Sequence, residues 1–146
     1  MTVSKIPLVA VIGHPIFHSK SPRLHGNWLK KLGLPGYYIP VDVEPADFGH
    51  VLKTMPKMGF VGANVTIPHK HLALTYADHV SDRAALIGAA NTLSFSEDGK
   101  IYADNTDGYG FIENIKDHQS NWNAASGPAL VLGAGGASRA VLSALI

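Results

Sequence analysis

Short apolar segments alternate with longer amphipathic ones along the first half of the chain. Three runs of apolar and β-branched residues are short enough to be strands of a sheet, at residues 7–13, 37–43 and 60–66. The segments between them predict helices, one ending near Gly33 and one broken by Pro56, and Pro68 opens a further helix. Pro40 indicates that the second strand lies at a sheet edge or carries a bulge. This alternation predicts an α/β fold, with a mostly parallel sheet in a three-layer domain.

The second half of the chain predicts a short helix, a hairpin and a separate C-terminal segment. Residues 81–87 indicate the helix, and two strand-like runs flank Asp98 and Gly99, a strong hairpin signal. A helix over residues 107–116 is followed by a polar stretch, an apolar strand at 129–132, a glycine-rich turn and an apolar helix. The pattern divides the chain into a domain over residues 1–116, a linker over 117–128 and the truncated start of a Rossmann-type second domain over 129–146.

Composition narrows the class of partner. The chain has twelve Lys and Arg residues and eleven Asp and Glu residues, and no run of like charges occurs. This charge distribution argues against a nucleic-acid partner. The chain has no cysteine, which excludes disulfides and thiolate chemistry and is compatible with a reducing cytoplasm. The first residues read as a strand and carry neither a secretory signal nor a membrane span. We therefore expect a cytoplasmic protein that binds a small molecule and no membrane.

The loop after the first strand offers two hydroxyl groups. Ser19 and Ser21 lie just before a predicted helix, where exposed N–H groups and hydroxyls suit a carboxylate. The alternative is that Ser21 is the N-cap of the helix and Ser19 an ordinary loop residue. In a parallel sheet, loops that follow strands gather at one edge, so these hydroxyls should lie close to the loop after the third strand.

That second loop carries an amide, a hydroxyl and an amine. Asn64 and Thr66 lie two residues apart and point to the same side of a strand. Lys70 follows in the first turn of the helix opened by Pro68, where the helix dipole disfavours a cation. Its alternative is a flexible surface lysine whose ammonium group reaches water.

Two further polar residues lie beside turns. Asn91 begins a strand after a tight turn, and Asp107 precedes a helix in the segment NTDGYG. Each has an ordinary explanation, because Asn tolerates turn conformations and Asp is a common N-cap. The eight histidines lack carboxylate or cysteine partners at ligand spacing, so we predict no metal site.

The glycine-rich turn has the context of a dinucleotide site. Residues 133–140, GAGGASRA, directly follow the predicted strand 129–132 and open a helix. Glycines there allow a tight turn and a close approach of the backbone to a pyrophosphate at the helix N-terminus. Ser138 stands where the general pattern has a third small residue.

Five segments in this order and spacing resemble those of the shikimate dehydrogenase family: GHPIFHSKSP, ANVTIPHK, GAANTL, NTDGYG and GAGGASRA. The resemblance implies that Ser19 and Ser21 bind the substrate carboxylate, and that Lys70 and Asp107 form the catalytic pair. It places Asn64, Thr66, Asn91 and Asp107 on the ring hydroxyls and the reacting oxygen. It also implies that the cofactor phosphates lie along Gly133, Ala134, Gly135, Gly136 and Ala137, with Ser138 and Arg139 nearby.

The reaction implied by the resemblance is the reversible reduction of 3-dehydroshikimate to shikimate by NADPH, in aromatic amino-acid biosynthesis. Family chains continue beyond this point to complete the nucleotide-binding sheet, so we expect this chain alone to be inactive or nearly so. The Ser-Lys-Ser segment resembles the shikimate-preferring members more than the quinate-using ones. A substrate-binding fragment without catalysis and a remnant that associates through its apolar C-terminal segment, as in a homodimer, are the alternatives.

Overall fold

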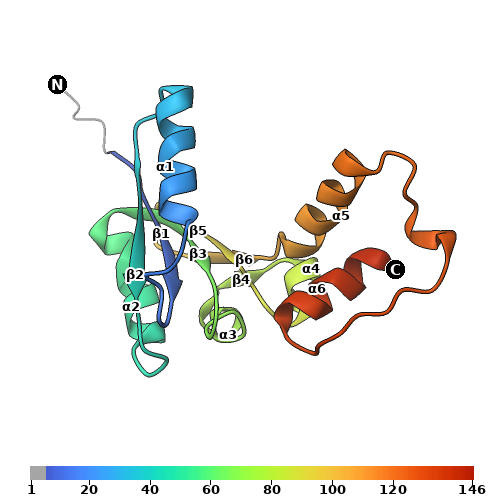
Figure 1. The fold of residues 1–146 in the computed structure, drawn as a ribbon. Coiled ribbons are helices and arrows are strands. Elements are labelled where there is room, and N and C mark those ends of the chain that lie inside the picture. The colour runs from blue at the N-terminus through green and yellow to red at the C-terminus, as the bar shows by residue number, and fades with distance from the viewer. Residues whose placement is uncertain (1–5) are drawn as a thin grey trace.

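The fold is built around one mixed sheet with helices on both of its faces (Figure 1). The computed structural model describes residues 6–146, so the first five residues of the predicted first domain lie outside the described residues. The strands are β1 (Leu8–Gly13), β2 (Tyr37–Asp42), β3 (Phe60–Val65), β4 (His79–Val80), β5 (Thr92–Phe95) and β6 (Ile101–Asp104). The α-helices are α1 (Ser21–Leu32), α2 (Phe48–Thr54), α3 (Leu72–Tyr76), α4 (Asp82–Ile87), α5 (Asp107–His118) and α6 (Gly136–Leu145). Two 3-10 helices complete the described part, η1 (Met55–Met58) and η2 (Ala124–Ser126).

The sheet has the order β2-β1-β3-β5-β6-β4. β1 pairs in parallel with β2 and β3, and β4 pairs in parallel with β6, whereas β5 runs antiparallel to both of its neighbours. Only β5 is reversed within the described part, which confirms the predicted mostly parallel α/β sheet. β2 lies at the edge, in agreement with Pro40, and β5 and β6 form the hairpin predicted around Asp98 and Gly99. The two-residue β4 was not predicted, because so short a strand leaves no periodic pattern.

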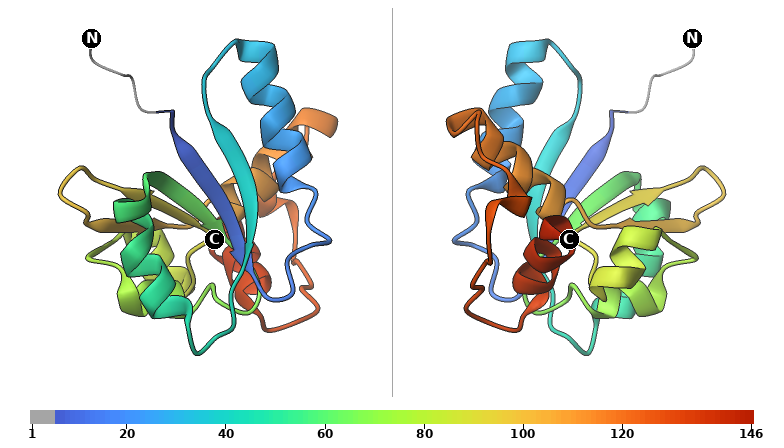
Figure 2. Two further views of the ribbon diagram at one scale, coloured as in Figure 1. Left: turned by 90° about the vertical axis from the view of Figure 1, so that its left-hand side faces the viewer. Right: turned by 90° about the vertical axis from the view of Figure 1, so that its right-hand side faces the viewer.

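The helices cover the two faces of the sheet unequally. α1 and α2 lie on opposite sides of β1 and β2 in both views of Figure 2. α1 contains no buried residue, although its apolar side packs near β1 and β2, and it ends at Gly33 in the left-handed conformation, as predicted. α2 instead buries Phe48, Gly49 and Leu52. The hydrophobic core therefore lies mainly on the α2 side.

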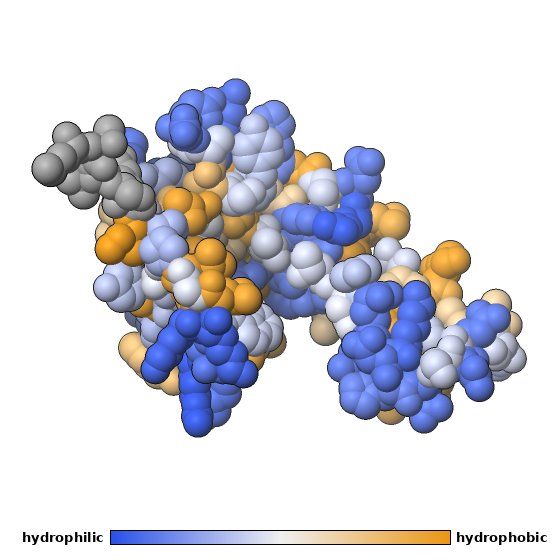
Figure 3. Space-filling model, turned by 90° about the horizontal axis from the view of Figure 1, so that it is seen from above, coloured by the Kyte–Doolittle hydropathy of each residue, from blue (hydrophilic) through white to orange (hydrophobic). Residues whose placement is uncertain are grey.

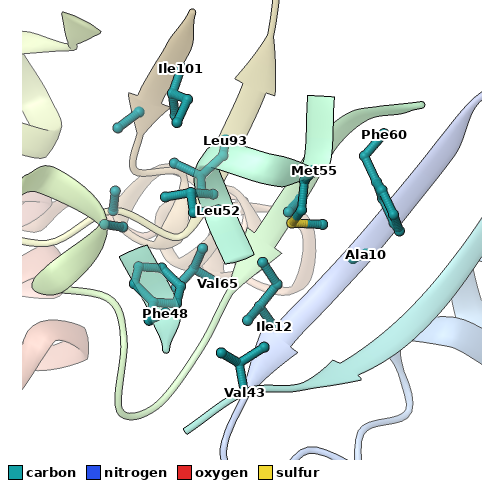
Figure 4. Packing of buried hydrophobic residues seen from close by; sticks show 14 residues of the cluster. Ala10, Ile12, Val43, Phe48, Leu52, Met55, Phe60, Val65, Leu93 and Ile101 are labelled. Carbon is teal, nitrogen blue, oxygen red and sulfur yellow. The ribbon is translucent and has the colours of Figure 1, made fainter. Parts of the chain in front are cut away.

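That core is made by alternate residues of the central strands and by α2 and η1 (Figure 4). Ala10 and Ile12 of β1 are fully buried against Phe48, Leu52 and Met55. Side chains two apart on a strand point to the same face, so this spacing directs one set of apolar residues towards α2. Burying each large apolar side chain stabilises the fold by about 1.5–3 kcal/mol. The core fixes the positions of the strand ends that carry the polar loops.

The predicted strand at residues 129–132 is wrong. Residues 128–134 have no regular structure, and Leu130 and Leu132 are 87% and 88% exposed. A strand needs a neighbour to accept its backbone hydrogen bonds, and within residues 6–146 no strand lies next to this segment. Apolar composition alone therefore did not produce a strand here.

The helix after the glycine-rich turn forms as predicted and packs on α5. Gly108 at the start of α5 is buried, and a Cβ built on it would lie 2.6 Å from the carbonyl oxygen of Ala140 in α6. α6 also contacts α4. In Figures 1 and 3 the part made by α5, η2 and α6 extends to one side of the sheet. The absence of a side chain at Gly108 thus allows α6 to dock beside the start of α5.

The helices are short and the surface is mixed. The longest helices, α1 and α5, have 12 residues each, and among residues 6–146 no helix is long and apolar enough to cross a membrane. Figure 3 shows hydrophilic and hydrophobic residues interspersed over the face seen from above.

We predict that Gly108→Ala loosens the contact between α5 and α6. The new methyl group meets a backbone carbonyl that cannot rotate away, so the chain should lose about 1–3 kcal/mol of stability or release α6. Urea unfolding combined with hydrogen exchange of α6 amides measures both effects. The matched control is Gly110→Ala in the same helix, where an added Cβ meets nothing and should stabilise by about 0.5–1 kcal/mol. Equal effects of the two substitutions would contradict the packing argument.

Candidate active site

A lysine and an aspartate meet at the edge of the sheet where the parallel strands end. Lys70 Nζ lies 2.5 Å from Asp107 Oδ2, although the two residues are 37 positions apart. Lys70 follows β3 and Asp107 follows β6, so the two strands deliver them to the same edge. Their side chains are 19% and 28% exposed, which keeps the pair partly shielded and still reachable from solvent. This is the amine–carboxylate pair that the sequence pointed to.

The local structure around Lys70 differs from the prediction. Lys70 lies in a turn over residues 67–71, and α3 begins only at Leu72. The backbone explains the difference, because the Lys70 carbonyl accepts a hydrogen bond from Ala90 N–H at 2.8 Å instead of entering a helical ladder. Lys70 is therefore held by the segment that carries Asn91.

Asn91 orients the carboxylate of the pair. Its Nδ2 donates to Asp107 Oδ1 at 2.7 Å and to Thr106 Oγ1 at 3.1 Å, while its Oδ1 accepts from Thr106 N–H at 3.0 Å. Asp107 is the first residue of α5, and Thr106 occupies the N-cap position without a side-chain cap. Asp107 is therefore not the N-cap, and its carboxylate contacts Lys70 and Asn91. Thr106 was not singled out from the sequence.

A second residue that the sequence prediction missed is Tyr38. Its hydroxyl donates to Asn64 Oδ1 at 2.7 Å, and Asn64 Nδ2 donates to the Asn91 carbonyl at 3.2 Å. Burial raises the pKa of Tyr38 to about 12, and a hydrogen bond from the Ser21 side chain acts in the opposite direction. The only sequence signal for Tyr38 is an aromatic residue with a polar tip in an edge strand. Its role needed the register that puts β1 between β2 and β3.

The two serines lie at the other end of this network. Ser19 Oγ accepts a hydrogen bond from Ser21 N–H at 3.3 Å, and both residues are partly buried. Ser21 is the first helical residue of α1, and Lys20 is at the N-cap position without a side-chain cap, so the N-cap expected at Ser21 is wrong. The Ser19 hydroxyl satisfies an N–H group at the start of the helix instead.

Thr66 is near this network and not part of it. It directly follows β3, and its N–H donates to Ile12 O at 2.9 Å. Its methyl group lies close to Gly13, where a built Cβ would be only 2.7 Å away. Among the described residues its hydroxyl makes no hydrogen bond to the other site residues, which leaves it available to a ligand.

The glycine-rich turn faces the same region. Gly133 has a φ of +123°, Gly135 is the N-cap of α6 and Gly136 is its first residue. A Cβ built on Gly136 would lie 3.4 Å from Ala89 Cβ and 3.9 Å from Lys70 Cδ. The backbone of Ala134 and Ala137 continues this exposed turn, Ser138 Oγ donates to Gly135 O, and the Arg139 guanidinium lies beside Gly88. The start of α6 thus adjoins Lys70 directly.

The arrangement can support proton transfer to a polar ligand. Lys70 supplies an ammonium group held by a carboxylate, and hydroxyl and amide groups line the path from Ser19 to Asp107. No three His, Asp or Glu side chains gather as metal ligands anywhere in the described residues 6–146.

Comparison with known proteins identifies the family. A family model described as the shikimate dehydrogenase substrate binding domain matches residues 11–93, more than half of the chain. The chain belongs to the shikimate dehydrogenase family. The matched residues include both serines, Asn64, Lys70 and Asn91, so the family match covers most of the polar network.

Curated relatives and solved structures agree with this assignment. The NADP(+) shikimate dehydrogenase of Roseobacter denitrificans is 60% identical over 146 residues, which are 100% of this chain and 53% of that protein. The enzyme of a Ruegeria species is 62% identical over the same length. The structure of the Thermus thermophilus shikimate 5-dehydrogenase with NADP(H) and shikimate has a TM-score of 0.87 and 44% identity, over 95% of this chain and 51% of that one. The chain spans about half the length of the relatives it matches.

One buried polar side chain, that of His69, lies next to Lys70 in the sequence. His69 is 0% exposed, its Nε2 lies 2.7 Å from Val43 O, and its Nδ1 has no partner among the described residues. Burial lowers the pKa of His69, while the Val43 carbonyl acts in the opposite direction. The folded chain therefore holds a neutral imidazole, whereas the unfolded chain protonates near the ordinary value of about 6.5.

We predict that this histidine makes the chain less stable in weak acid. Because the unfolded state binds the proton first, stability contributed by neutral His69 is complete above pH 6.5 and is lost as the pH falls towards the lowered folded pKa. The loss is at most about 1.4 kcal/mol per pH unit. Urea unfolding of wild type and His69→Gln between pH 8 and 5.5 measures it, since the variant lacks this titration. The stability difference between the two proteins should shrink with falling pH, and a constant difference would refute the assignment.

Proposed function

We propose that this chain is the substrate-binding part of an NADP-dependent shikimate dehydrogenase that reduces 3-dehydroshikimate to shikimate. The observation that carries the proposal is the 2.5 Å contact between Lys70 Nζ and Asp107 Oδ2 at the end of a continuous polar network. Relatives named NADP(+) shikimate dehydrogenases match the whole chain at about 60% identity, which supports the same substrate and cofactor.

The proposed chemistry uses Lys70 as the proton donor. Addition of hydride to the ketone carbon converts the carbonyl oxygen into an alkoxide, which must be neutralised as it forms. The Lys70 ammonium gives a proton to this oxygen and becomes an amine, and in the oxidative direction the amine takes the hydroxyl proton back. Asp107 holds the ammonium group in place and accepts a hydrogen bond from a neighbouring ring hydroxyl.

The remaining polar groups are proposed to orient the substrate. Ser19 and Ser21 bind the carboxylate at one end, and Asn64, Thr66 and Asn91 bind the ring hydroxyls between the serines and Lys70. The support for this orientation is the order of the groups, since hydrogen bonds run from Tyr38 through Asn64 to Asn91 and on to Asp107. A rigid acid with hydroxyls along one edge matches such an order.

The cofactor assignment rests on the glycine-rich turn and the relatives. Residues 133–139 present exposed backbone at the start of α6, where the N–H groups and the helix dipole suit a pyrophosphate. The cofactor would supply the hydride. The close approach of Gly136 to Lys70 supports a single cleft for both ligands.

The domain division and the cellular context are further parts of the proposal. Residues 1–116 would be the substrate-binding domain, 117–128 the linker and 129–146 the start of the nucleotide-binding domain. The exposed Leu130, Leu132 and Leu142 support association with further protein, such as a homodimer partner or the rest of the sheet. A cytoplasmic location follows from a soluble cofactor and substrate.

We predict that a chimaera of this chain and the relative's remaining half oxidises shikimate with NADP. The chimaera joins residues 1–146 to the part of the Roseobacter denitrificans enzyme beyond its matched region. In it, Lys70→Ala should lower kcat by about 10²- to 10⁴-fold with a much smaller change in the KM for shikimate. The readout is the absorbance of the reduced cofactor. Unchanged kcat would remove Lys70 from the mechanism. A chimaera that binds shikimate without turnover supports a binding function only.

We also predict that Tyr38→Phe weakens shikimate binding to the 146-residue chain. The substitution removes the hydroxyl that donates to Asn64, and one hydrogen bond is worth about 1 kcal/mol, or roughly a fivefold higher Kd. Titration calorimetry measures the affinity. Tyr37→Phe is the matched control, because Tyr37 is the adjacent residue, points to the other face of the sheet and is 60% exposed. Equal affinities of the two variants would contradict a role for Tyr38 in the site.

A further inference from the structure

His69 is a polar residue in an otherwise apolar region. Its ring stacks on Phe48 of the core, with centroids 4.5 Å apart and an interplanar angle of 10°. Its one side-chain contact with a polar atom is the 2.7 Å hydrogen bond to Val43 O, which directly follows β2. Burying an imidazole costs free energy unless its polar atoms are hydrogen-bonded, and here the bond to Val43 O offsets part of that cost.

The position of His69 in the chain suggests what its hydrogen bond to Val43 does. Lys70 lies in a turn, so no helical ladder fixes its backbone. On the C-terminal side of the turn, the Lys70 carbonyl accepts a hydrogen bond from Ala90 N–H. On the other side the turn is fixed by His69, whose N–H donates to Thr66 O at 2.9 Å and whose ring reaches across to Val43. Lys70 is thus anchored between two elements, the Ala90 segment and the end of β2.

We propose that His69 is a positioning residue, whose ring holds the turn against Val43 so that Lys70 Nζ reaches Asp107. The Val43 carbonyl can only accept, so the proton is on Nε2 and the buried Nδ1 carries the lone pair. A phenylalanine fills the same space and keeps the stacking on Phe48, but it leaves the Val43 carbonyl unpaired. The amide nitrogen of a glutamine can take the place of Nε2.

The inference rests on the proposed role of Lys70 only for its effect on turnover. Its direct consequence, the contact of Lys70 with Asp107, is measurable in the chain itself. The Lys70 side chain is only 19% exposed while it contacts Asp107, and an amine that leaves this contact is reached more readily by an acylating reagent. The rate of Lys70 acylation therefore reports whether the contact persists.

The first experiment measures acylation of each lysine by an N-hydroxysuccinimide ester in the folded 146-residue chain, followed by peptide mass spectrometry. In His69→Phe the rate at Lys70, relative to Lys116, should rise by about threefold or more. In His69→Gln it should remain near the wild-type rate. His118→Phe is the matched control, because His118 also lies 2.8 Å from a backbone carbonyl but is exposed and distant in sequence from Lys70. An unchanged Lys70 rate in folded His69→Phe overturns the proposal.

Two further measurements separate positioning from general loss of structure. If His69→Phe does not fold, His69→Asn takes its place, because its shorter amide cannot reach Val43, and it should also raise the Lys70 rate. In the chimaera, His69→Phe should lower kcat by about 10- to 100-fold with little change in KM, and His69→Gln should restore it. Equal kcat in all three proteins overturns the proposal. An inactive wild-type chimaera refutes the proposed function alone, since the acylation result still decides the role of His69.

Discussion

The position of one ion pair depends on the sheet that carries both of its residues. Lys70 and Asp107 are 37 residues apart, and each follows a different strand of the same sheet. An exposed pair of this kind would contribute at most about 1 kcal/mol to stability. Here the pair is partly buried and bound on both sides, by Ala90 through the Lys70 backbone and by Asn91 through the carboxylate. The geometry of the pair is therefore imposed by the sheet.

The polar network joins residues from separate elements of the fold. Hydrogen bonds connect Tyr38 of β2 with Asn64 of β3, and through Asn91 they reach Asp107 at the start of α5. Each hydrogen bond is modest, but leaving any of these partly buried groups unpaired costs more than the bond contributes. The network thus stays in one arrangement before a ligand arrives, which reduces the ordering that binding requires.

In the C-terminal segment the structure differs from what the local sequence pattern predicts. Residues 129–132 have the composition of a buried strand, yet Leu130 and Leu132 are exposed because no strand within residues 6–146 pairs with them. α6 forms nevertheless, since a helix satisfies its own backbone hydrogen bonds, and it docks on α5 through Gly108. Lys70 presents the opposite case: the sequence suggested a helix, and a hydrogen bond from Ala90 keeps it in a turn.

The sequence by itself determined the α/β class, the edge position of β2, the hairpin at Asp98 and the family to which the motifs belong, because these depend on local periodicity and short spacings. It also identified most of the polar site residues. Only the tertiary structure decided that Tyr38 and Thr106 contact these residues. It also decided that the Ser19 hydroxyl, and not that of Ser21, accepts a hydrogen bond from an N–H group at the start of α1, and that His69 is buried beside Lys70. The reason is physical: these contacts join residues from strands and loops distant in sequence, and their partners are fixed by strand order and register, which no local pattern encodes.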